Sequence, residues 1–220
     1  MRWADSSFYV DSVAGTIYPR RKPRGDDAMG FIRSVRHNLS NLLNFSGREN
    51  RAAFWPYVGF VLGIMFAGMV VVMVPLMAQT FTKMQQFAIA HPDQATVVSG
   101  PGSYSITIEG NHPELMPNID GLIGGVSGIC LLVICLLAAA VVRRLHDRGK
   151  SGVWGLLPVP FLAFGFTMMP KMFHQSPPEM NLFFMLFFNN LIYLAALATL
   201  VVLLAGESAM NENKYGPAVR

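Results

Sequence analysis

The chemically reactive side chains of this sequence gather in one ten-residue stretch, 143–152, which reads RRLHDRGKSG. It holds four cations, a histidine next to an aspartate, and two glycines. Such side chains can bind a phosphate or carboxylate through charge-assisted hydrogen bonds, or can satisfy one another's charges. His146 and Asp147 do not make a triad, because adjacent helical residues point about 100° apart and no nucleophile accompanies them. We therefore expect no enzyme and no catalytic residue, with a hydrolase using Ser151 as the weaker alternative.

Composition predicts the elements that must position this stretch. The chain is 52% hydrophobic and only 14% charged, with a mean hydropathy of +0.39, whereas soluble domains are about 25% charged. A helix needs roughly 20 mostly apolar residues to cross a bilayer. The sequence has four such runs, at about 54–78, 122–142, 153–169 and 182–205. It therefore predicts an all-α membrane protein with four transmembrane helices.

The distribution of cations predicts the orientation. Of 17 Lys and Arg residues, nine precede the first span and four lie in the turn after the second. Only Lys83 and Lys171 fall in the other two loops. Because positive charge favours the cytoplasmic side, both termini and the 143–152 turn should be cytoplasmic. No early apolar core indicates a cleaved signal peptide, so the first span should be retained.

Residues 1–44 are expected to form a cytoplasmic tail that includes an amphipathic helix. The tail carries the basic cluster RRKPR at 20–24, which should attract anionic lipid rather than nucleic acid. Within 29–44, Ile32, Val35, Leu39 and Leu42 recur at helical spacing. This pattern predicts a helix on the cytoplasmic leaflet, or alternatively a helix packed on a soluble partner.

The segment 44–57, NFSGRENRAAFWPY, contains signals for the start of the first membrane helix. Ser46 followed by Glu49 resembles a capping box and predicts a helix beginning at Gly47. Arg48 and Arg51 would then share one face, where they can touch a lipid phosphate or a partner carboxylate. Pro56 should bend or restart the helix.

The loop between the first two spans, 79–121, should lie outside and contain a small β-hairpin. Apolar and polar residues alternate on both sides of Gly100-Pro101-Gly102, which is typical of two short strands joined by a turn. His91 and His112 have no close further ligand, so we expect them to be solvated and predict no metal site. Cys130 and Cys135 lie five residues apart in one helix and cannot form a disulfide with each other.

The methionine stripe of the first span has two interpretations. Four methionines follow each other at four-residue spacing: Met65, Met69, Met73 and Met77. Thioethers are soft ligands for copper(I), but methionine is also an adaptable packing residue. We favour packing. Glycines four apart, such as Gly59 with Gly63, Gly121 with Gly125 and Gly124 with Gly128, likewise indicate close helix packing, within one chain or between chains.

The third span suggests an alternative function. Pro158 and Pro160 remove backbone donors and free carbonyls nearby, and broken helices of this kind line binding sites in transporters. A small-solute or metal transporter is therefore the alternative hypothesis. We favour a simple kink, repaired by neighbours such as Asn189, Asn190 and Tyr193, because no ionisable residue lies well inside any span.

Three blocks resemble a known family. They are FSGRENRAAFW at 45–55, RRLHDRGKSGVW at 143–154 and NKYGP at 213–217. The sequence between 45 and 217 resembles the bacterial inner-membrane family catalogued as domain of unknown function 805, and residues 218–220 follow it. The resemblance implies a small four-helix protein of the bacterial cytoplasmic membrane, without an established activity. Ala53 departs from the family, which often has an acidic residue there, and the 79–121 loop is longer than usual.

All three blocks fall on the predicted cytoplasmic side, so we expect them to meet, with Arg48, Arg51, Arg143 and Arg144 around Asp147. Arg143 and Asp147 are i and i+4 and could pair, while Gly149 and Gly152 allow a tight turn and Ser151 can cap the third helix. The structural interpretation is a charge-satisfied turn that holds the fold. The functional interpretation is a site for an anionic lipid headgroup, a membrane protein partner or a second copy, without cofactor. The candidate residues are Arg48, Arg51, Arg143, Arg144, His146, Asp147, Asn213 and Tyr215.

Overall fold

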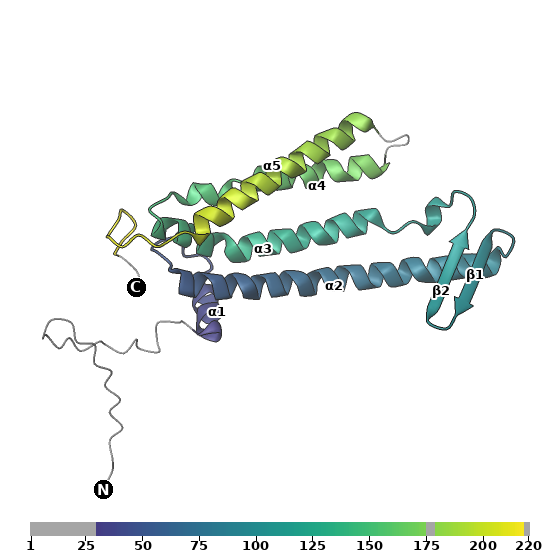
Figure 1. Cartoon of the computed structure of the whole chain (residues 1–220), viewed down its shortest axis with the longest axis horizontal. Helices are drawn as coiled ribbons and strands as arrows, with labels where there is room; N and C mark the ends of the chain where they lie inside the picture. Colours follow the sequence, from purple (N-terminus) through teal and green to yellow (C-terminus); the bar gives the residue numbers. More distant parts are fainter. Residues whose placement is uncertain (1–29, 175–178, 218–220) are drawn as a thin grey trace, which may run out of the picture.

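The computed structural model describes residues 30–174 and 179–217 (Figure 1). Most of the predicted tail, including the basic cluster at 20–24, and the end at 218–220 lie outside the described residues. The α-helices are α1 (Phe31–Ser40), α2 (Arg51–Ala90), α3 (Ile119–Asp147), α4 (Val159–His174) and α5 (Met180–Ala205). Two strands, β1 (Ala95–Gly100) and β2 (Ser103–Ile108), and two 3-10 turns, η1 (Pro113–Leu115) and η2 (Gly152–Leu156), complete the order.

The four predicted spans are confirmed as four helical segments long and apolar enough to cross a membrane. The first is longer than predicted, because α2 continues for 40 residues to Ala90. Pro56 and Pro75 lie inside α2, so the helix does not restart at Pro56. Along the methionine stripe, Met65, Met69 and Met73 are half-buried and Met77 is exposed.

The third span is broken where its prolines lie. The turn η2 ends at Leu156, and α4 starts at Val159 and runs to His174, beyond the predicted limit of 169. Trp154 O accepts a hydrogen bond from Leu157 N at 3.3 Å, and Pro158 O accepts one from Leu162 N at 3.1 Å. Because Pro160 occupies the first turn of α4, where amide hydrogens lack helical partners anyway, it does not interrupt that helix.

The predicted hairpin is confirmed in the loop after α2. β1 pairs with β2 in antiparallel register, with Val97 opposite Ile106. Gly102 has φ +82°, which glycine adopts without the strain of a side chain. The Tyr104 ring lies 5.7 Å from the Phe81 ring in an edge contact, which attaches the hairpin to the far end of α2.

The helices form two antiparallel pairs, α2 with α3 and α4 with α5, which diverge toward the hairpin (Figure 1). The pairs meet at the opposite end, where α1, the 143–152 turn and the C-terminal segment gather. We call this the closed end. Tyr57 is fully buried there and donates to Leu136 O at 2.8 Å. The core at this end consists of Phe54, Tyr57, Val61, Ala140, Leu145, Leu200 and Leu204.

Glycine lets α2 and α3 approach closely, but not at every predicted position. A Cβ on Gly125 would lie 2.9 Å from Val72 Cγ1, and one on Gly68 would lie 3.2 Å from Ile129. In contrast, a Cβ on Gly59, Gly63, Gly124 or Gly128 would meet nothing within 4 Å. The packing prediction therefore holds for Gly125 and fails for these four positions within this chain.

We expect Gly125→Val to lower the free energy of unfolding by about 1–3 kcal/mol, because the new side chain overpacks the contact with Val72. Gly128→Val is the matched control, since it places the same side chain three residues away in open space. Thermal unfolding of both variants in one detergent measures the difference. Equal unfolding temperatures would contradict this description of the α2–α3 contact.

Candidate functional site

The segment before α2 adopts a different start from the predicted one. α2 begins at Arg51, and its N-cap is Asn50, whose side chain accepts from Ala53 N at 2.9 Å. The prediction of a helix from Gly47 was wrong, because Gly47 has φ +87° and Glu49 is drawn into an ion pair instead of a capping box. Arg48 therefore lies in a loop, not on the same helix face as Arg51.

The turn after α3 follows the prediction more closely. Gly149 has φ +68° and terminates α3, with its amide donating to His146 O at 2.9 Å. Gly152 is needed for a different reason, since a Cβ there would lie 2.7 Å from Val142 Cγ1. Ser151 caps the following turn η2, where its hydroxyl accepts from Val153 N at 3.4 Å.

Arg144 is the most buried cation of the site, with a side chain that is 0% exposed. Its Nη1 lies 2.5 Å from Asp147 Oδ2, an i,i+3 pair, and 2.9 Å from Ser208 Oγ. The predicted i,i+4 pair of Arg143 with Asp147 was therefore wrong. Arg143 and Arg144 point in different directions from α3 because successive helical residues are rotated by about 100°.

Arg144 of α3 and Arg148, the residue after α3, also contact the end of α5. The last turn of α5 has no basic residue of its own, and the last four carbonyls of a helix need partners from elsewhere. Arg144 donates to Leu204 O at 2.9 Å, and Arg148 donates to Leu203 O at 3.1 Å. These contacts place positive charge at the negative end of the helix dipole, where it is stabilising.

Arg48 connects the C-terminal segment to Asp147 at the end of α3. Its side chain is 1% exposed, and its guanidinium lies 3.1 Å from Asp147 Oδ1. Its other donors reach backbone carbonyls of the C-terminal segment, including Asn211 O at 3.0 Å and Gly216 O at 3.2 Å. Asp147 is thus shared by Arg48 from the loop and Arg144 from α3.

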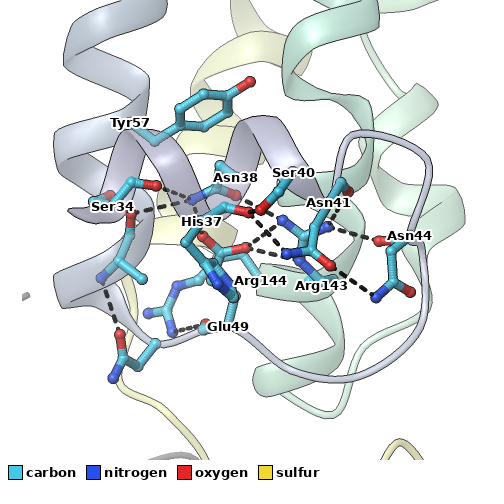
Figure 2. Close-up of polar contacts among 12 residues, drawn as sticks. Ser34, His37, Asn38, Ser40, Asn41, Asn44, Glu49, Tyr57, Arg143 and Arg144 are labelled. Carbon is cyan, nitrogen blue, oxygen red and sulfur yellow. Dashed lines mark hydrogen bonds and ion pairs between the residues drawn. The ribbon is translucent and has the colours of Figure 1, made fainter. Parts of the chain in front are cut away.

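Arg143 joins α3 to α1 through a second carboxylate (Figure 2). Its Nη2 lies 2.8 Å from Glu49 Oε2 and 2.6 Å from Asn38 Oδ1, and Asn38 Nδ2 donates to Glu49 Oε1 at 2.7 Å. Ser34 on α1 also donates to Ala53 O. Nη1 of Arg143 donates to Asn41 O at 2.9 Å and Asn44 O at 2.6 Å. The inward face of α1 is therefore polar and fixed by hydrogen bonds.

His146 lies beside these pairs and packs on the tail. Its ring stacks on Tyr215 at 3.7 Å between centroids, and Asn213 Nδ2 donates to His146 O at 3.0 Å. His146 lies four residues beyond the predicted membrane span 122–142. Burial lowers the pKa of its imidazole, the charge of Lys214 lowers the pKa further, and the backbone of Gly47 opposes the shift. The imidazole therefore favours its neutral form.

The structure brings seven of the eight candidate residues together, although not as one ring around Asp147. Only Arg48 and Arg144 contact that carboxylate, and Arg143 contacts Glu49. Arg51 stands apart, exposed on α2, with one 3.5 Å contact to Ala205 O. Their role in binding a ligand stays a prediction.

Sequence reasoning missed the role of Glu49 and Asn38. Glu49 was assigned to a helix cap, yet it is the only carboxylate in the 44–57 segment and lies four residues before Ala53. A single carboxylate between two arginines was the sequence signal that could have indicated an ion pair at Glu49. We call the five residues Arg48, Glu49, Arg143, Arg144 and Asp147 the arginine clasp; each of their side chains is 5% exposed or less.

The chemistry of the clasp is that of a closed set of ion pairs. Three guanidinium groups face two carboxylates, and the remaining donors contact backbone carbonyls and the polar side chains of Asn38 and Ser208. Buried cations need such partners, because an unpaired charge in the interior is very costly. The clasp thus joins α1, α2, α3 and the C-terminal segment at one end of the bundle.

Fold and site together define a multi-pass membrane protein whose helix ends are fastened by buried arginines. The family model of proteins of unknown function named DUF805 matches residues 42–217. The chain belongs to this family, as its three sequence blocks suggested. Neither a curated protein nor a solved structure gives a significant match.

Proposed function

We propose that the chain is a non-catalytic protein of the bacterial inner membrane, with cytoplasmic termini, which binds anionic phospholipid through α1. The observation that carries this proposal is the outward face of α1. Phe31, Ile32 and Leu43 at this face and just after it are 56%, 81% and 88% exposed. They lie outward because the opposite face of α1 carries Ser34 and Asn38, which are buried and hydrogen-bonded to Ala53 O and to Arg143.

An apolar hollow between α1 and α2 supports the same proposal. It measures about 590 Å³ and is lined by Phe31, Val35, Leu39 and Phe60, with Arg36 among its residues. Figure 1 shows α1 lying across the start of α2, next to the membrane spans. An acyl chain suits the apolar walls. The exposed guanidinium groups of Arg33 and Arg36 on α1 supply cations for the phosphate.

The clasp arginines are poor candidates for this lipid contact. Arg48, Arg143 and Arg144 are buried, and their donors already meet oxygen atoms of the protein. We therefore assign the lipid phosphate to the exposed cations, and protein partners remain the competing hypothesis for the cytoplasmic face. The transporter hypothesis has less support, because Trp154 O, the carbonyl that Pro158 would leave without a helical donor, accepts a backbone hydrogen bond from Leu157 N.

Native mass spectrometry of the full chain in mixed phosphatidylglycerol and phosphatidylcholine nanodiscs tests the lipid proposal. Each cation near an anionic surface contributes about 1 kcal/mol, so Arg33→Ala with Arg36→Ala should reduce retained phosphatidylglycerol roughly thirtyfold. Lys83→Ala with Lys171→Ala removes two exposed cations from the opposite end and should change retention little. Equal retention in the two double variants would refute the proposal.

A further inference from the structure

The helix α5 carries an amide side chain near the middle of its apolar span. Asn190 is the eleventh of 26 residues in Met180–Ala205, about 4 Å from the helix centre along its axis. It is exposed, and its side chain has no hydrogen-bond partner among the described residues. Its neighbour Asn189 differs, since Asn189 Nδ2 donates to Phe161 O at 3.0 Å. Because hydrocarbon offers no hydrogen bonds, an unpaired amide at this depth is costly.

Asn190 lies in a heptad pattern on the exposed surface of α5. The pattern has spacings of four and three residues, and its five apolar members are 36% to 50% exposed. Apolar heptads of this kind form the seam between two helices, and one polar residue in the seam fixes their register. We call this stripe the α5 seam; it consists of Phe183, Phe187, Asn190, Leu194, Leu197 and Val201.

The α5 seam borders an open groove that can receive side chains of another helix. The groove lies between α4 and α5, measures about 380 Å³ and includes Phe183, Phe187 and Asn190 in its α5 wall. Its α4 wall is apolar, with Phe161 and Phe166 among its residues. The seam is thus a continuous apolar surface interrupted by a single amide.

We propose that the α5 seam pairs with the α5 seam of a second copy of this chain. All copies insert with the same orientation, so two α5 helices related by an axis along the membrane normal run parallel. Asn190 then lies opposite Asn190 of the second copy at equal depth. An amide carries both a donor and an acceptor, so the seam is complementary to itself. An acyl chain has no polar group that could hydrogen-bond Asn190 at this depth. An unrelated helix would need a polar side chain of its own at the same depth.

Disulfide crosslinking of the full chain in liposomes tests this proposal. In a background with Cys130→Ala and Cys135→Ala, Leu194→Cys places a thiol in the seam one turn from Asn190. Ile192→Cys is the matched control at nearly the same depth, about 160° around the helix. We expect an oxidant to link two chains through Leu194→Cys and not through Ile192→Cys.

The amide itself is tested within the Leu194→Cys chain. Adding Asn190→Leu should weaken association about tenfold, the usual order for interhelical polar contacts in membranes, and Asn190→Gln should retain it. The proposal is overturned if Leu194→Cys gives no linked dimer, if both cysteine positions link equally, or if Asn190→Leu leaves the linked fraction unchanged. Each result is read at low protein-to-lipid ratio, where random collisions contribute little.

Discussion

Asp147→Ala is expected to lower the free energy of unfolding by about 3–5 kcal/mol, because it leaves two buried guanidinium groups without their carboxylate. Arg48 and Arg144 both lie against Asp147, and all three side chains are at most 1% exposed. In addition, Arg144 holds the end of α5 and Arg48 holds the C-terminal segment. The loss should therefore reach several elements at once. Unfolding in mixed detergent, followed by tryptophan fluorescence, measures the effect.

Asp120→Ala is the matched control for this prediction, because it removes a carboxylate from the other end of the same helix. Asp120 pairs with His174 at 2.8 Å, but the two side chains are 64% and 60% exposed. An exposed pair contributes less than about 1 kcal/mol. If both aspartate variants unfolded alike, the burial of the clasp would have no energetic consequence.

Glu49→Ala is expected to have the second largest effect, about 3 kcal/mol, because Arg143 loses its carboxylate in a buried position. Asn38 loses its carboxylate acceptor in the same step, so α1 should be held less tightly to the bundle. Hydrogen exchange measures this directly. We expect protection to fall across Phe31–Ser40 while the middle of α2 and α3 keeps its protection.

The control for Glu49→Ala is Glu207→Ala, which removes an exposed carboxylate from the same end of the molecule. Its exchange pattern and stability should match those of the unchanged chain. Loss of protection in α1 after Glu207→Ala, or unchanged protection after Glu49→Ala, would show that the Arg143 contacts do not hold α1.

Features that depend on composition along the chain were predictable. Four apolar runs are long enough to cross a bilayer, and the 79–121 loop has alternation around a Pro-Gly turn, so spans and hairpin follow from elementary rules. The convergence of the three sequence blocks was also predictable, because the distribution of cations put them on one side. The extension of α2 to Ala90 was not predicted, because the limits of the span were taken from its apolar run and the helix continues beyond that run.

The pairing within the clasp was beyond sequence reasoning for physical reasons. Arg143 and Arg144 are neighbours, and a rotation of about 100° decides which of them meets Asp147. Both the i,i+3 and the i,i+4 spacing allow a pair with Asp147, so the choice between the two arginines depends on how α3 packs and not on local spacing. The carbonyls of Leu203 and Leu204 are backbone groups, so no side-chain motif marks them as partners. Glu49 was misassigned because the same residue suits a cap and an ion pair.

We infer that the arginine clasp is internal structure, and we propose that the lipid contacts lie elsewhere. The most direct test measures unfolding free energy and retained phosphatidylglycerol on the same Asp147→Ala sample, below its unfolding temperature. We expect the free energy of unfolding to fall by about 3–5 kcal/mol and the retained phosphatidylglycerol to stay unchanged. A lipid site at these arginines would instead gain affinity on losing its competing carboxylate. Unchanged stability with increased lipid retention would show instead that lipid binds at the clasp.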